Sequence, residues 1–154
     1  MSKFHNHKVY IVSANGLSRK FHSASSAQAY CAENELVFKD CTEIFDSDKE
    51  SRRWEYLQVL EQQGKITNLQ RQVEYLLIPA QYEDVLKTVR KKQVLKKHRI
   101  EAPTTYKADF VYNLPDGQLV VEDVKSEYTR KLQEYVIKRK LMLYIHNIKL
   151  TEII

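Results

Sequence analysis

The turn at Pro115-Asp116-Gly117 constrains the fold more than any other short segment of this chain. Proline presets φ at the first turn position, and glycine can take the left-handed conformation that closes a three-residue hairpin loop. Residues 106–125 around it are therefore predicted to form a β-hairpin. A three-residue loop sets Asp109 directly opposite Asp123, with their Cβ atoms about 4.5–5.5 Å apart. A two-residue loop would move Asp123 to the other face, and we favour the three-residue loop.

This hairpin would gather three charged side chains on one face. Because side chains alternate along a strand, Lys125 shares the face of Asp123 and Asp109, while Phe110 and Val124 pack the opposite side. Aspartate is depleted in strands, and two opposed carboxylates repel each other unless a cation lies between them. The pattern predicts a site for a divalent cation. The alternative interpretation is a solvated hairpin that carries ordinary charges.

An upstream helix is predicted over residues 48–63, and Gly64 would end it. Ser47 and Glu50 form a Ser-x-x-Glu capping box, which gives Glu50 a sufficient structural role. Glu50 also lies one turn before Trp54 on the inward face of this helix, from which a carboxylate could reach a metal. Both interpretations of Glu50 stay open at this point.

At these residues the chain resembles a known group of nucleases. Asp109, thirteen intervening residues and then Asp123-Val124-Lys125 are similar to the PD-(D/E)xK signature of restriction-endonuclease-like enzymes. A longer match is to a family of small phage and prophage proteins grouped with those nucleases. It covers about residues 44–154 and is carried by Phe45-Asp46-Ser47, Glu50, Gly64-Lys65-Ile66, Gln72, residues 106–112, residues 121–125, Thr129, Tyr135, Lys138 and Lys140.

The chain departs from the superfamily pattern at two places. Ala108 stands where many members have proline before the first aspartate, and that proline is often absent. Ser126-Glu127 follows the lysine where glycine is expected, which affects the shape of the loop more than the chemistry.

The resemblance implies an α/β (α+β) fold with a restriction-endonuclease-like αβββαβ core over residues 45–154, preceded by a ββα appendage over residues 1–44. It further implies a Mg²⁺-dependent endonuclease, with Mn²⁺ as a substitute, that hydrolyses DNA phosphodiester bonds. Asp109, Asp123 and the main-chain carbonyl of Val124 would hold the metal, Glu50 would complete the site, and Lys125 would orient the attacking water. Branched DNA is one substrate, as in junction resolution during recombination, and a homodimer would cut two strands.

The remaining elements are predicted from local patterns. Residues 8–22 alternate around Asn15-Gly16, the strongest short hairpin signal, and Ser23 can cap a helix over about 24–35. This appendage would cover the core or an edge strand; contact with DNA or a partner is the alternative. Residues 66–79 are predicted to form a strand, and Gln72 within it is either a neighbour of the site or an ordinary strand glutamine with its hydrogen bonds satisfied. Thr129 can cap a helix over about 130–145 with Leu132, Val136 and Leu143 as an apolar stripe and with Tyr135 and Met142 beside it. Residues 147–153 alternate as a closing strand.

Basic residues point to a polyanionic partner. Residues 86–99 carry seven Lys/Arg and no acid, with only a partial helical stripe, and the net charge is +5. Such a run is usually a solvated face, but here it directly precedes the proposed catalytic strand. Candidate DNA contacts are Lys91, Lys92, Lys96, Lys97, Arg130, Lys138 and Lys140.

Composition limits the class of protein. The 154 residues, 43% hydrophobic and 29% charged, suit one globular domain with a small appendage. There is no run of roughly 20 apolar residues and no signal peptide, so we expect no membrane partner and a cytoplasmic protein, in the host cytoplasm if it is phage-encoded. Cys31 and Cys41 are expected to be free thiols, and His5 and His7 tail residues. A catalytically inactive DNA-binding module and a phage interaction protein are the competing functions.

Overall fold

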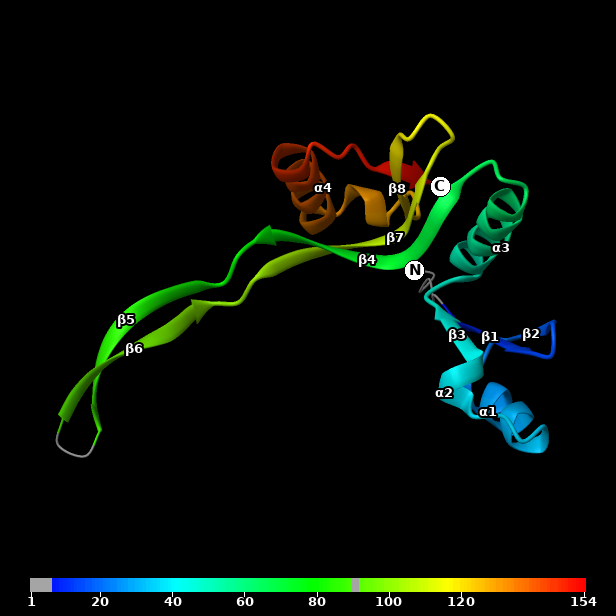
Figure 1. Cartoon of the computed structure of the whole chain (residues 1–154), viewed down its shortest axis with the longest axis horizontal. Helices are drawn as coiled ribbons and strands as arrows, with labels where there is room; N and C mark the ends of the chain where they lie inside the picture. The colour runs from blue at the N-terminus through cyan, green and yellow to red at the C-terminus, as the bar shows by residue number, and fades with distance from the viewer. Residues whose placement is uncertain (1–6, 90–91) are drawn as a thin grey trace. The chain divides into compact units, whose positions relative to one another are not determined.

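The computed structural model describes residues 7–89 and 92–154 and has a mixed α+β structure (Figure 1). The chain divides into two compact units, Met1–Gln63 and Gly64–Ile154. The first contains strand β3 (Thr42–Phe45), which spans the sequence-based boundary near residue 44, and helix α3 (Asp48–Gln62), which follows it. The domains 1–44 and 45–154 stay a prediction. His5 and Lys91 lie outside the described residues.

The first unit is built on a three-stranded sheet with the order β2-β1-β3. Strand β1 (Val9–Ala14) is antiparallel to both β2 (Leu17–Phe21) and β3. The turn between β1 and β2 holds Asn15 at φ 52° and Gly16 at φ 77°. Two positive φ values in a two-residue turn suit the right-handed twist of the paired strands. The hairpin predicted from Asn15-Gly16 is confirmed.

Helices of the first unit pack on this sheet through two small cores. Val12 packs with Ala27 and Cys31 of α1 (Ala24–Glu33), while Trp54 of α3 packs against the core of Val9, Ile11 and Phe45. The side chain of Ser23 accepts a hydrogen bond from the Ser26 N–H, so the predicted cap of α1 is confirmed. A short helix, α2 (Phe38–Cys41), leads into β3, and both cysteines are free thiols.

A four-stranded sheet with the order β4-β7-β8-β9 forms the centre of the second unit. Its strands are β4 (Thr67–Ile78), β7 (Thr104–Asn113), β8 (Leu119–Val124) and β9 (Thr151–Ile153). The first three are antiparallel neighbours, and β9 runs parallel to β8. A parallel neighbour requires a crossover connection, which α4 (Gln133–His146) provides. The predicted strand over 66–79 is confirmed as β4.

Helix α4 differs from the prediction in its start and in its buried face. Its N-cap is Leu132, and Thr129 belongs to a separate 3-10 turn (Thr129–Lys131), where its hydroxyl accepts from the Ser126 N–H instead of capping the helix. Tyr135 and Met142 are its buried residues. The predicted apolar stripe is wrong because the side chains of Leu132 and Leu143 are 42% and 52% exposed. Tyr135 and Met142 join Ala108, Val111 and Val121 in one core cluster.

The closing strand is shorter than the predicted 147–153. Asn147 ends α4 in the left-handed conformation at φ 55°, and the Ile148 N–H donates to the Met142 carbonyl. These bonds belong to the end of the helix, so residues before Thr151 do not pair with β8 in the described structure.

The basic run over 86–99 lies in strands, although its sequence shows a partial helical stripe. β5 (Gln81–Val89) and β6 (Lys92–Glu101) pair antiparallel as a separate two-stranded ribbon (Figure 1). The ribbon is inserted between β4 and β7, so five described strands lie between α3 and α4 in place of the three expected. Among the described residues, none of the helices is both long and apolar enough to span a bilayer.

Candidate active site

The β7–β8 hairpin has the predicted three-residue loop. The Leu114 N–H donates to the Gln118 carbonyl, the Gly117 N–H donates to the Leu114 carbonyl, and Gly117 has φ 85°. Beyond the loop, Val111 pairs with Val121 and Phe110 with Glu122. This register rules out the two-residue alternative, which would have shifted every pair by one residue.

Asp109 binds the backbone of β8 just beyond the last paired residues. Its Oδ2 accepts a hydrogen bond from the Val124 N–H at 2.8 Å, where a main-chain carbonyl of the neighbouring strand would accept in a regular antiparallel pair. Its Oδ1 lies 3.4 Å from Nε2 of Gln72, whose φ of 54° interrupts β4 at this level. Gln72 therefore contacts the candidate site, as one interpretation of its position expected. Asp109 is thus fixed beside the backbone of Val124, the residue between Asp123 and Lys125.

Asp123 is the most buried charged group of the site. Its exposed fraction is 0%, and its Oδ1 lies 2.8 Å from Nζ of Lys125, whose side chain is 25% exposed. The backbone N–H of Lys125 donates to the Ile153 carbonyl, which anchors the residue to β9. The other carboxylate oxygen of Asp123, Oδ2, is buried and has no hydrogen-bond partner among the described residues. A buried carboxylate costs several kcal/mol unless it is paired, so half of this group is left uncompensated.

Two tyrosines border Asp123, and the motif did not single either of them out as part of the site. The hydroxyls of Tyr106 and Tyr135 are buried, and within the described structure neither makes a hydrogen bond of ordinary geometry. Burial first, and then the negative charge of Asp123, raises the pKa of both phenols far above the ordinary value. Lys125 Nζ lies 5.4 Å from the centre of the Tyr135 ring. The family resemblance includes both tyrosines, but their place beside Asp123 follows only from the packing of α4 over β7 and β8.

A second charged group adjoins Tyr135 on its other side. Arg139 Nη1 lies 2.6 Å from Glu152 Oε1, and Arg130 Nη2 lies 3.3 Å from Glu152 Oε2. Burial alone would raise the pKa of Glu152, but the hydrogen bond from Arg139, the nearby hydroxyl of Tyr135 and the charges of both arginines hold it below the usual range. Because Glu152 is paired in register with Asp123 across β8 and β9, these charges belong to the surroundings of the candidate site.

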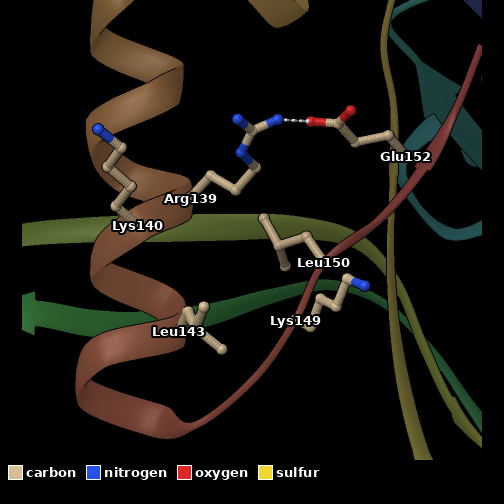
Figure 2. A pocket seen from close by; sticks show the side chains of 6 residues that line it. All are labelled: Arg139, Lys140, Leu143, Lys149, Leu150 and Glu152. Carbon is tan, nitrogen blue, oxygen red and sulfur yellow. Dashed lines mark hydrogen bonds and ion pairs between the residues drawn. The ribbon is translucent and has the colours of Figure 1, made fainter.

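The Arg139–Glu152 pair forms one wall of a hollow of about 400 Å³ (Figure 2). Lys140, Leu143, Lys149 and Leu150 line the rest of it. Figure 2 shows the pair bridging α4 and β9. Three of the lining side chains are cations and one is an acid, so an anion is the ligand that the hollow favours.

The donor set around Asp123 suits a hard cation with an incomplete protein shell. Asp109, Asp123 and the Val124 carbonyl offer only oxygen, which Mg²⁺ prefers, and the buried, unpartnered Oδ2 of Asp123 fits such a ligand. Within residues 7–89 and 92–154, no three His, Cys, Asp or Glu side chains gather as a metal cluster. Mg²⁺ commonly uses one or two carboxylates and takes its remaining ligands from water and substrate phosphate. The residues therefore fit Mg²⁺ and do not form a closed cage.

Glu50 caps α3 within the first unit. Its N–H donates to Ser47 Oγ at 3.2 Å, and its Oε2 accepts from the Asp46 N–H at 2.9 Å. The predicted capping interaction is confirmed, and the Glu50 side chain is buried. Asp109 and Asp123 belong to the second unit, so a contribution of Glu50 to their chemistry stays a prediction.

The candidate DNA-binding residues fall into two groups. Lys92, Lys96 and Lys97 are exposed on β6. The others lie in or near α4, where Arg130 contacts Glu127 and Glu152, Lys138 contacts Glu134 at 2.8 Å, and Lys140 lines the hollow of Figure 2. The β6 lysines are the cations most available for phosphate.

Comparison with known proteins gives one family. A family model described as a protein of unknown function (DUF1064) matches residues 27–154, which is most of the chain. The match includes α3, both aspartates of the candidate site and α4. No curated protein and no solved structure matches the chain.

Proposed function

The chain belongs to the DUF1064 family, and we propose that it is a Mg²⁺-dependent endonuclease that hydrolyses DNA phosphodiester bonds. The observation that carries the proposal is the Asp123–Lys125 pair beside Asp109, with one buried carboxylate oxygen left for a cation. A buried carboxylate beside a lysine, with one oxygen that has no hydrogen-bond partner in the described structure, is costly in a stable core and is therefore typical of a functional site.

The order of elements supports a nuclease core. Helix α3, strands β4, β7 and β8, helix α4 and strand β9 follow one another as helix, three strands, helix and strand once the inserted ribbon is set aside. This is the order that the resemblance to PD-(D/E)xK nucleases implies. In our proposal the αβββαβ arrangement is that core, with Asp109 in the middle of its second strand and Asp123 near the end of its third.

Each residue of the site has a separate role in the proposed reaction. Asp109, Asp123 and the Val124 carbonyl would hold Mg²⁺, and Mn²⁺ is expected to substitute for Mg²⁺ at the same site. The bound ion neutralises charge on the phosphate and favours deprotonation of the attacking water. Lys125 directs its ammonium toward the developing negative charge of the phosphate and orients the water. Because its ammonium is paired with a carboxylate 2.8 Å away, we assign Lys125 a positioning and charge-stabilising role and not the role of the base.

The substrate and setting extend the same proposal. A small phage or prophage enzyme acting in the host cytoplasm during recombination would cut branched DNA, and a homodimer would cut both strands. These assignments rest on the family resemblance, which is an argument by analogy.

An inactive nuclease-fold binding protein is the second candidate. The observation in its favour is that the described residues hold no metal cluster of three or more acidic, histidine or cysteine side chains. Both candidates predict DNA binding, and only the first predicts cleavage that requires Mg²⁺, Asp123 and Lys125. A nicking assay with and without Mg²⁺ on linear, single-stranded, flapped and four-way DNA, with Asp123→Ala as control, separates them.

A further inference from the structure

The β5–β6 ribbon is built as an interaction element. The described side chains of β6 are exposed along the whole strand, and Leu86, Leu95 and Ile100 are 66%, 62% and 54% exposed. A two-stranded hairpin alone is marginally stable in water, because neither face is buried. A ribbon that keeps both faces in solvent is therefore expected to gain stability from a partner.

Charge identifies the partner. The acids Glu83, Asp84 and Glu101 all lie near the base of the ribbon, and Glu83 and Asp84 are opposite His98 and Lys97. Farther out, from 85 to 89 and from 92 to 96, the described residues include three lysines and no acid. These lysines are Lys87, Lys92 and Lys96, and Lys97 adds a fourth cation at the level of Asp84. The outer ribbon therefore suits a polyanion.

Its shape suits one groove of a DNA duplex. The register places Lys87, Lys92 and Lys96 on one face and Lys97 on the other, because opposed and alternate residues share a face. The major groove is about 12 Å wide, admits a two-stranded ribbon and has a phosphate backbone along each wall. The ten residues of β6 span roughly 30 Å, which is close to one turn of B-DNA, about 34 Å.

We infer that the β5–β6 ribbon is a DNA-binding arm that lies in the major groove and holds the duplex independently of the catalytic centre. The identity of the polyanion as DNA rests on the proposed function. The lysines contact phosphates on both walls, so the arm supplies affinity and orientation with little sequence preference. The apolar pair Leu86 and Leu95, directly opposed in the register, stabilises the ribbon through cross-strand contact.

The test is equilibrium binding of a fluorescent 30-base-pair duplex in EDTA, so that cleavage plays no part. The arm variant carries Lys87→Gln, Lys92→Gln, Lys96→Gln and Lys97→Gln. The matched control removes the same charge from four exposed lysines elsewhere, through Lys8→Gln, Lys39→Gln, Lys49→Gln and Lys65→Gln. Each lost phosphate contact reduces the slope of log K against log salt by about 0.9. We expect the slope of the arm variant to fall by about three to four, and that of the control to stay within one.

Two further measurements complete the test. A chain in which Asn-Gly replaces residues 85–96, which joins the opposed residues Asp84 and Lys97, should lose most of the same affinity while its helical circular dichroism and melting transition persist. Methyl green, which occupies the major groove, should displace the wild type from DNA, and netropsin, which occupies the minor groove, should not.

Equal salt slopes for the arm variant and the control, or displacement by netropsin alone, would overturn the proposal that the ribbon is a DNA-binding arm. So would a dimer that dissociates on Leu86→Ser with Leu95→Ser while DNA binding is unchanged, since the ribbon would then bind a second copy.

The proposal of a DNA-binding arm and the proposal of nuclease activity can be disproved independently of each other. Arm-dependent binding without cleavage in Mg²⁺ would support the arm and defeat the proposed enzyme. Cleavage in Mg²⁺ with binding indifferent to the arm lysines would defeat the arm and leave the enzyme standing.

Discussion

Lys125 Nζ lies 2.8 Å from Oδ1 of Asp123, a carboxylate whose exposed fraction is 0% and whose second oxygen has no hydrogen-bond partner in the described structure. Two groups only two residues apart on an ordinary strand would both point to one face. Here that face is covered by α4, so the pair is enclosed by Tyr106 and Tyr135. The protein keeps a costly group where apolar packing would be more stable, and the predictions below follow from that arrangement.

Mg²⁺ should stabilise the folded protein through Asp123. A ligand at a hundred times its Kd adds about 2.7 kcal/mol to the free energy of unfolding. Thermal unfolding of the wild type should therefore shift upward as Mg²⁺ is added, and Asp123→Asn should remove the shift. Asp116→Asn, in the exposed loop of the same hairpin, is the matched control and should keep it. An identical shift in all three proteins would place the ion elsewhere.

Loss of the ammonium should slow cleavage without unfolding the chain. Lys125→Met keeps the aliphatic stem that packs near the Tyr135 ring and removes the charge. Groups that stabilise charge in a transition state are worth about 10²–10³ in kcat. We expect a loss of that size in single-turnover cleavage, with Mg²⁺ binding retained. A variant that cleaves at the wild-type rate would remove Lys125 from the mechanism.

Glu50→Gln separates capping from chemistry. Glutamine can still accept the hydrogen bond from the Asp46 N–H, so the free energy of unfolding should change by less than about 1 kcal/mol. If Glu50 contributes to metal binding, as the sequence predicts, cleavage should fall and the Mg²⁺ requirement should rise. Ser47→Ala serves as control, because it costs about 1 kcal/mol of helix capping and should leave cleavage unchanged. Unchanged kinetics in Glu50→Gln would leave capping as its role.

Alkaline pH should destabilise the second unit through its buried phenols. The pKa of Tyr106 and of Tyr135 is raised in the folded protein, while an unfolded tyrosine ionises near pH 10. The unfolded state therefore releases protons first, and stability falls as the pH rises above about 10. Urea unfolding at pH 8–11 should show this loss, and Tyr135→Phe should reduce it. Tyr144→Phe, whose side chain is 87% exposed, is the control that should not. An equal loss of unfolding free energy above pH 10 in all three proteins would contradict the assignment of this loss to the buried phenols.

Acid should weaken the link between α4 and β9. Because the pKa of Glu152 is held low in the folded protein, its charged form adds stability above about pH 4.3, and this is lost as the pH falls through the folded pKa. The difference in unfolding free energy between wild type and Glu152→Gln should be largest at neutral pH and vanish in acid. Glu134→Gln, which breaks a solvent-exposed pair, should show a smaller difference. A difference independent of pH would mean that packing, not charge, is involved.

Local signals predicted the hairpins and the helix cap correctly. Pro115-Asp116-Gly117 and Asn15-Gly16 specify their turns through φ, and Ser47 with Glu50 specifies a cap through hydrogen bonds between near neighbours. Each of these signals depends on residues a few positions apart, so the sequence contains the whole interaction.

Tertiary packing decided what the local patterns could not. The buried face of α4 carries Tyr135 and Met142 because it meets β7 and β8, whereas the more obviously apolar Leu132 and Leu143 remain exposed. Tyr106 and Tyr135 come from different elements and border Asp123 only after the chain has folded. The basic ribbon resembled a weak helix because its lysines hide the alternation of strands that are exposed on both faces.

The central claim is that Asp123 and Mg²⁺ act together on a DNA phosphodiester. The most direct measurement is the rate of nicking of supercoiled and four-way DNA by purified wild type and by Asp123→Asn, each in Mg²⁺ and in EDTA. Cleavage only by the wild type in Mg²⁺, from two proteins with the same circular dichroism, is the predicted result. Equal cleavage by Asp123→Asn, or none by a folded wild type in either Mg²⁺ or Mn²⁺, would contradict the claim.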